Sequence, residues 1–197
     1  MKKDKRILEV FKKNKGYAQA KEVLEAGFHH SILNMLVQEG EILKVKRGLY
    51  RLSSLEMEDE LEGVVKIIPE GIVCLFSAWN YHALTDFVSS EYHVAIEKSR
   101  KIVLPDYPPI KLYFWTQKYW EIGIEEVLIG NTTVRIYNQE KSVCDALRFR
   151  NKIGQDTTKE VLKNYLKKQQ RDVDKLLQYA RLLRVGELMK MYLNILL

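Results

Sequence analysis

The stretch FHHSILNMLVQEGEILKVKRGLYRL, residues 28–52, places the tightest constraint on the fold of this chain. Its first half has apolar residues at helical spacing and polar residues on the opposite face, which predicts an amphipathic helix that ends at Gly40. Two short apolar runs, 42–45 and 49–52, then flank a turn at residues 46–48, as in a β-hairpin. The stretch therefore predicts a helix followed by a basic hairpin.

Two further helices are predicted before this stretch. Apolar spacing favours one over residues 4–13 and another over 18–26, and Gly27 makes a tight turn into the next helix. Three short helices followed by a hairpin are typical of a winged helix-turn-helix, whose third helix enters the major groove of DNA while the hairpin, or wing, contacts the backbone. The predicted DNA-binding residues are His30, Ser31, Asn34 and Gln38 in the third helix, and Lys44, Lys46, Arg47 and Tyr50 in the wing.

Charge is distributed unevenly along the chain. Residues 1–52 hold 12 Lys+Arg against 6 Asp+Glu, residues 53–109 hold 4 against 10, and residues 110–197 hold 16 against 10. A basic N-terminal module favours a polyanionic partner, and double-stranded DNA is the one that the helix order predicts. The alternative is a small helical cap with a solvated basic face.

The predicted fold class is α+β. A winged helix-turn-helix over residues 1–52 is followed by an acidic connector, 53–62, and by a mixed α/β domain with a helical C-terminal end over 63–197. The elements predicted inside that domain are a helix at 77–84, strands at 92–96 and 111–115, a hairpin across 124–137, and helices from 138 onward.

Local signals predict where several of these helices begin and end. Ser77 is placed to cap the helix at 77–84, and Thr157 and Glu160 have the spacing of a capping box. Gly154 is expected to end one helix and Asp172 to begin another.

The sequence contains no Gly-rich phosphate loop, no His-Glu-x-x-His and no paired-Cys cluster. Ser77, His82 and Asp86 are the residue types of a nucleophilic triad, but neighbours on one helix cannot generally adopt triad geometry by themselves. Glu140 and Asp145 are candidate acids for an enzyme acting on nucleic acid, although favourable charge at a helix N-terminus explains Glu140 more simply. We expect no enzyme activity and no cofactor.

Metal binding and membrane insertion are not expected either. Two cysteines and two histidines, Cys74, His82, His93 and Cys144, lack the spacing of a metal site, and both thiols are expected to be reduced core residues. No apolar run is long enough to cross a membrane, and the start MKKDKR lacks the apolar core of a secretory signal. These features predict a cytoplasmic protein with no membrane partner.

Three motifs stand out along the chain: Gly40-x-Ile42-x-x-Val45-x-Arg47-Gly48-Leu49-Tyr50 in the wing, Pro69-x-Gly71-x-Val73-Cys74-x-x-Ser77-Ala78 followed by His82-Ala83-Leu84, and Glu140-Lys141-Ser142-Val143-Cys144-Asp145. Together they resemble the motifs of the AbiEi-type antitoxins of bacterial abortive-infection, type IV toxin–antitoxin systems, which act in phage resistance. The resemblance covers nearly the whole chain.

The resemblance implies a protein with two activities. The winged domain would bind inverted repeats in its own promoter and repress transcription, and the C-terminal domain would counter a nucleotidyltransferase-like toxin without forming a stable complex with it. A homodimer on DNA is a reasonable expectation because helix-turn-helix proteins commonly read two half-sites. The residues that carry the C-terminal motif are Ser77, His82, Glu140, Lys141 and Asp145.

An alternative function remains open at this point. A winged-helix transcription regulator could instead respond to a small ligand bound by its aromatic C-terminal domain, without any toxin partner.

Overall fold

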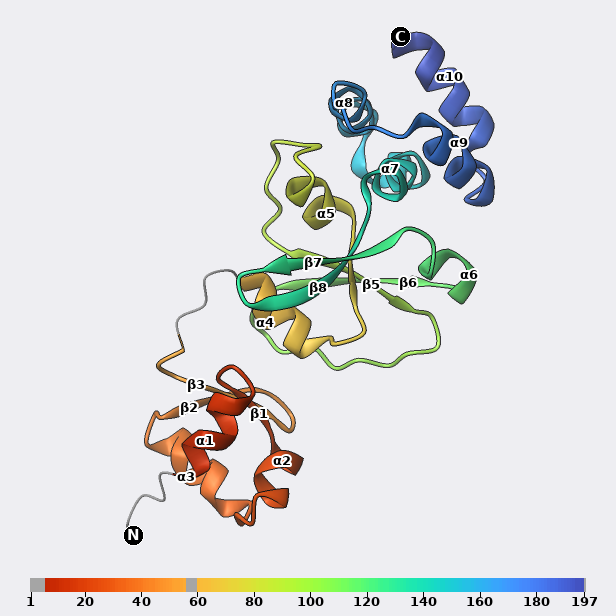
Figure 1. Cartoon of the computed structure of the whole chain (residues 1–197). Coiled ribbons are helices and arrows are strands. Elements are labelled where there is room, and N and C mark those ends of the chain that lie inside the picture. The colour runs from red at the N-terminus through yellow and green to blue at the C-terminus, as the bar shows by residue number, and fades with distance from the viewer. Residues whose placement is uncertain (1–5, 56–59, 197) are drawn as a thin grey trace. The chain divides into compact units, whose positions relative to one another are not determined.

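The computed structural model describes residues 6–55 and 60–196, and the chain divides into two compact units (Figure 1). Unit 1 comprises residues 1–69 with 102–108, and unit 2 comprises 70–101 with 109–197. Both contain helices and a β-sheet, so the α+β class is confirmed. No helix in the described ranges is long and apolar enough to cross a membrane.

Unit 1 contains four helices and a three-stranded antiparallel sheet within its described residues. Strand β3 is central and pairs with β1 on one side and β2 on the other. This helix and strand order fits a winged helix-turn-helix. The elements are α1 (Arg6–Lys13), β1 (Tyr17–Gln19), α2 (Ala20–Glu25), α3 (Ser31–Gln38), β2 (Ile42–Lys46), β3 (Leu49–Leu52) and α4 (Glu60–Ile67).

The core of unit 1 lies between its first three helices and the sheet. Its buried side chains are Ile7, Phe11, Ala18, Val23, Leu33, Leu36, Ile42 and Tyr50. These residues are the regularly spaced apolar positions from which the helices and strands are predicted. Each element therefore packs one apolar face into the core.

The structure corrects the second predicted helix of unit 1. Tyr17 and Ala18 are buried and pair with β3, so the first part of the expected helix over 18–26 is a strand. Gln19 then begins α2 through a capping box, in which the Glu22 carboxylate accepts a hydrogen bond of 2.7 Å from the Gln19 amide. The start of the first predicted helix, at Asp4, lies outside the described residues.

The expected acidic connector, 53–62, overlaps the start of α4. Residues 53–55 follow β3, α4 begins at Glu60, and residues 56–59 lie outside the described ranges. Unit 2 begins at Glu70.

Unit 2 is a five-stranded mixed sheet with helices α5 and α7–α10 gathered on one side of it (Figure 1). The strand order is β6-β5-β4-β8-β7. The elements are β4 (Ile72–Val73), α5 (Leu75–Tyr81), β5 (Tyr92–Glu97), β6 (Ile110–Trp115), α6 (Gln117–Trp120), β7 (Ile124–Ile129), β8 (Thr132–Tyr137), α7 (Gln139–Ile153), α8 (Gln155–Leu166), α9 (Val173–Leu182) and α10 (Gly186–Leu196).

Helix α7 is the centre of unit 2, because α5, α8 and α9 all pack against it. The first half of α7, from Glu140 to Leu147, is buried without interruption. The predicted strands and the hairpin across 124–137 are confirmed. Gly154 ends α7, and the Asp172 carboxylate accepts a hydrogen bond from the Lys175 amide at the start of α9, as expected.

Two predicted helix caps are wrong. Helix α5 begins at Leu75 rather than Ser77, and the Ser77 hydroxyl instead accepts a hydrogen bond of 2.9 Å from the His93 amide of β5. Helix α8 begins at Gln155, so Thr157 is already inside it. Glu160 accepts hydrogen bonds from the Thr85 hydroxyl and the Asp86 amide, which ties α8 to the loop after α5.

Candidate nucleic-acid interface and the buried motif of unit 2

Helix α3 exposes the polar face that the sequence predicts. His30, Ser31, Asn34 and Gln38 are exposed, whereas Leu33 and Leu36 are buried in the core of unit 1. The spacing of the buried leucines fixes the rotation of α3 about its own axis. The polar face is therefore held toward solvent, where a nucleic acid can reach it.

The polar residues of α3 differ in how freely they can bind a partner. The Ser31 hydroxyl lies 2.9 Å from His29 Nδ1, and the Ser31 amide donates to the same nitrogen, so this hydroxyl is already engaged at the helix start. Asn34 and Gln38 make no side-chain hydrogen bond to any described residue. A carboxamide can form two hydrogen bonds with an adenine edge, so the free side chains of Asn34 and Gln38 have the chemistry suited to contact a base.

The wing carries three predicted cations whose positions differ. Lys44 and Arg47 are exposed and make no ion pair with a described residue. Lys46 is half-buried, and its ammonium donates a hydrogen bond of 2.6 Å to the Ile67 carbonyl of α4. Burial also lowers the pKa of Lys46. Lys44 and Arg47 are therefore the wing cations that are free to meet phosphates.

Tyr50, which the sequence also assigns to this surface, is only 3% exposed. It lies in β3 opposite Ala18 and Lys44, and its ring belongs to the core of unit 1. The side chain supports the wing from inside and is not displayed on the surface.

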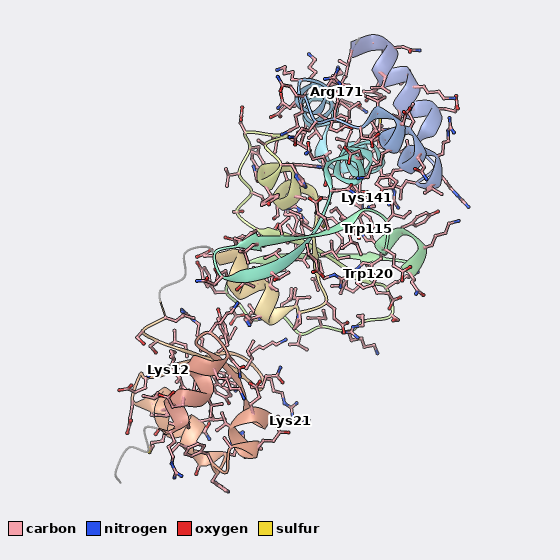
Figure 2. The ribbon with its side chains drawn as sticks, in the orientation of Figure 1. Lys12, Lys21, Trp115, Trp120, Lys141 and Arg171 are labelled. Atoms are coloured by element: carbon pink, nitrogen blue, oxygen red, sulfur yellow. The ribbon has the colours of Figure 1, made fainter. Side chains whose placement is uncertain are left out.

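The motif of unit 2 contains a buried ion pair at the start of α7. The Lys141 ammonium lies 2.8 and 2.7 Å from the two carboxylate oxygens of Asp145, and both side chains are fully buried. The same ammonium lies 3.6 Å from the ring centroid of Trp115 and 4.0 Å from that of Tyr137. Lys141 and Trp115 are labelled in Figure 2. A carboxylate and two aromatic faces thus replace the water that Lys141 loses on burial.

Burial is the main influence on the charges of this pair. It lowers the pKa of Lys141 to about 8 and raises the pKa of Asp145, while each partner opposes the shift of the other. The two short contacts between the Lys141 ammonium and the Asp145 carboxylate favour the charged form of both groups. Arg148 adds positive charge, with Nη1 at 3.7 Å from Asp145 Oδ1 and its guanidinium 4.9 Å from the Trp115 ring.

Glu140 belongs to a separate polar cluster on α7. One carboxylate oxygen lies 3.1 Å from the Tyr165 hydroxyl of α8, and the other lies 3.4 Å from the Lys175 ammonium of α9. These contacts join three helices. Glu140 and Asp145 therefore face different partners and do not form a pair of acids around one cavity.

Ser77 and His82 also have structural partners. The Ser77 hydroxyl binds the His93 amide, whereas His82 Nε2 lies 2.7 Å from the Tyr137 carbonyl and 3.6 Å from Glu125. The three triad residue types near α5 are thus not assembled into a nucleophilic site. Cys74 and Cys144 are buried free thiols, and no cluster of three metal-binding side chains is found in residues 6–55 and 60–196.

Sequence patterns do not identify Trp115 and Tyr137 as partners of Lys141. The aromatic run around Trp115 is typical of a strand, but only the sheet order brings β6 and β8 to the same helix. Two further contacts, from Lys46 to Ile67 and from Arg148 to Trp115, join residues more than 20 positions apart and carry no local sequence signal.

Two comparisons with known proteins found a similarity, one to the fold of the chain and one to its N-terminal sequence. The overall fold is similar to the crystal structure of the RV2827C protein from Mycobacterium tuberculosis, with a TM-score of 0.51 and 10% identity over 92% of this chain and 76% of that one. No curated protein sequence matches the chain. Residues 5–53 match the family described as "Transcriptional regulator, AbiEi antitoxin". The match agrees with the resemblance found in the wing, and the motifs at residues 69–84 and 140–145 lie outside the matched stretch.

Proposed function

We propose that this protein is a DNA-binding autorepressor and the antitoxin of a type IV toxin–antitoxin system, opposing a nucleotidyltransferase-like toxin. The observation that carries this proposal is the exposed face of α3 beside the free wing cations, in a segment that matches the AbiEi regulator family. The unpaired carboxamides and the unpaired cations are the groups that DNA recognition requires.

In the proposed complex, α3 lies in the major groove. Asn34 and Gln38, four residues apart, project from the same face and contact base edges, while Ser31 and His30 lie near the groove entrance. Lys44 and Arg47 on the wing contact phosphates. Two copies of the chain read two inverted half-sites, so the proposal predicts a palindromic operator.

A promoter–reporter assay tests the repressor half of this proposal. The region upstream of the gene is fused to a reporter, and the full chain is supplied in trans. We expect repression by the native chain and its loss in the Asn34→Ala, Gln38→Ala double variant. Lys21→Ala, which removes an exposed lysine of α2 paired with Glu25, is the matched control and should repress normally. Equal reporter output with and without the native chain would contradict the proposal.

A growth-rescue assay tests the antitoxin half separately. The proposal predicts a nucleotidyltransferase-like gene beside this one. That gene is expressed with and without this chain, and we expect the chain to restore growth. The Asn34→Ala, Gln38→Ala variant should rescue as well as the native chain when both are expressed from a foreign promoter, because unit 2 is the proposed antitoxin domain. Failure of the native chain to rescue would remove the antitoxin assignment and leave the repressor assignment standing.

A further inference from the structure

A cavity of about 490 Å³ lies beside the wing. All of its lining residues belong to unit 1, from strands β1–β3, the turn between β2 and β3, helix α4 and the segment 102–108. Sites for small molecules typically measure roughly 300–1,000 Å³. The cavity is therefore large enough for a ligand of the size of a mononucleotide.

The wall formed by the hairpin is strongly basic. Four cationic side chains line it, and two carboxylates line the rest of the cavity, which leaves an excess of two positive charges. The cations are Lys44, Lys46, Arg47 and Arg51, and the carboxylates are Glu60 and Asp106. The Glu60 carboxylate accepts a hydrogen bond from the Tyr107 hydroxyl, so part of the negative charge is already engaged.

The cations differ in what can reach them. Lys44 and Arg47 are exposed, so a DNA phosphate can contact them from outside. Lys46 and Arg51 are half-buried, and the Lys46 ammonium uses one of its donors on the Ile67 carbonyl. A small anion inside the cavity can therefore contact cations that the backbone of a rigid duplex reaches less easily.

The cavity also has flat apolar surfaces in its lining. Two tyrosines and two prolines, Tyr17, Tyr107, Pro105 and Pro108, line it. Tyr107 is 61% exposed although its hydroxyl is bonded to Glu60, so a planar group can reach this residue. Aromatic faces of this kind stack on nucleobases.

We propose that this cavity binds a nucleoside 5′-monophosphate, with the phosphate dianion against the hairpin cations and the base against Tyr107. The excess of two positive charges matches a dianion, and the flat wall matches a base. Because Lys44 and Arg47 also belong to the proposed DNA interface, bound nucleotide would weaken DNA binding. This last step rests on the proposed function, whereas nucleotide binding itself does not.

Isothermal titration calorimetry of the full chain tests the site without DNA. The probes are AMP, GMP, CMP and UMP. Adenosine, which lacks the phosphate, and inorganic phosphate, which lacks the nucleoside, serve as the two control ligands. We expect at least one nucleotide to bind with a Kd below about 1 mM. Arg51→Ala should weaken that binding by about tenfold, because it removes a hydrogen bond between charged groups, and Tyr107→Ala should weaken it because it removes the stacking surface.

Matched controls make the outcome decisive. Lys12→Ala removes an exposed lysine of α1 that pairs with Glu9 and does not line the cavity, so it should bind nucleotide as the native chain does (Figure 2). The proposal is overturned if no nucleotide binds, if adenosine or phosphate alone binds as tightly, or if both cavity variants, verified as folded by circular dichroism, bind normally.

A competition experiment separates this proposal from the proposed function. Labelled operator duplex is bound to the chain and titrated with the nucleotide found by calorimetry, and we expect its apparent Kd to rise. Absence of any operator binding would count against the proposed function, while the calorimetric result on the cavity would still stand. Operator binding that is unchanged by saturating nucleotide would overturn the competition step.

Discussion

Helices α3 and α7 carry polar pairs at the same spacing, but they use them in opposite ways. Asn34 and Gln38 lie four residues apart on α3 and face solvent, whereas Lys141 and Asp145 lie four residues apart on α7 and are fully buried. Spacing alone does not distinguish an exposed polar face from a buried ion pair. What distinguishes them is how much of the helix surface is covered by other elements.

The difference follows from the layout of each unit. In unit 1 the apolar core touches only one face of α3, where Leu33 and Leu36 lie. In unit 2 the first half of α7 is covered all round, with α5, α8 and α9 against it. A polar group in such a helix must find a partner inside the protein, because leaving it unpaired costs several kcal/mol.

The largest effect is expected from breaking the pair on α7. Lys141→Met leaves a buried carboxylate without its ammonium, so we expect the free energy of unfolding to fall by about 3–5 kcal/mol. The Lys141→Met, Asp145→Leu double variant removes both charges and should recover most of that loss. Urea unfolding followed by circular dichroism measures both. Lys190→Ala, at an exposed pair with Glu187, is the control and should change stability by less than about 1 kcal/mol.

A loss no larger than that of the Lys190→Ala control would contradict the structural role of the pair. Such a small loss would mean that Lys141 contributes no more to stability than the exposed residues of α3.

A second effect concerns how the folding stability of unit 2 depends on pH. Burial, with a smaller contribution from Lys111, lowers the pKa of His93 from 6.5 to about 4. The unfolded chain therefore takes up a proton below pH 6.5 that the folded chain rejects, so stability falls as pH falls from about 6.5 to about 4. The loss is at most ~1.4 kcal/mol per pH unit for this residue and stops below pH 4.

The variant His93→Phe isolates this contribution. It keeps a ring between Phe76 and Tyr113 while removing the titrating nitrogens that contact Ser89 and Tyr113. Urea midpoints at pH 7 and pH 5 should differ less in this variant than in the native chain. An equal difference in both chains would show that other groups control the acid sensitivity.

On α3, the expected effect is on specificity. Asn34→Ala and Gln38→Ala should each reduce the discrimination between operator and scrambled DNA by ~1–3 kcal/mol, the value of a good bidentate base contact. Because both side chains are exposed, stability should change by less than about 0.5 kcal/mol. Competition binding measures the first quantity and urea unfolding the second. Full discrimination in both variants would remove α3 from the interface.

The smallest effect is expected at the wing. Lys44→Ala with Arg47→Ala should reduce the slope of log Kd against log salt by about 1.8, or ~0.9 for each phosphate that the wing no longer neutralises. Lys46→Ala should change the slope less, since its ammonium is held by the Ile67 carbonyl. Lys12→Ala provides the exposed-lysine control. A larger change for Lys46→Ala than for the double variant would reverse the roles assigned to these cations.

Much of the fold follows from local sequence patterns. The wing, the hairpin across 124–137, and the helix ends at Gly154 and Asp172 all match, because turn residues and periodicity act over a few positions. The residue types of Ser77 and Glu160 favour capping roles. In the structure each bonds to a segment distant in sequence, which a local pattern cannot reveal.

The candidate sites show the same limit. The exposed face of α3 could be predicted because the helical period places Asn34 and Gln38 on a different face from the buried Leu33 and Leu36. The engagement of Lys46 by Ile67 and the burial of Tyr50 could not, since both depend on packing between segments. Resemblance identifies the motif at residues 140–145 in helix α7. The aromatic partners of Lys141, Trp115 and Tyr137, come from strands β6 and β8, which local sequence does not link to this motif.

Fluorescence anisotropy of a labelled duplex from the region upstream of the gene, against a scrambled duplex at two salt concentrations, is the most direct measurement of DNA recognition by α3 and the wing. We expect tighter binding to the upstream duplex, with affinity for both duplexes falling as salt rises. Equal affinity for the two duplexes, or no binding to either, would contradict the assignment of this face as a specific DNA interface.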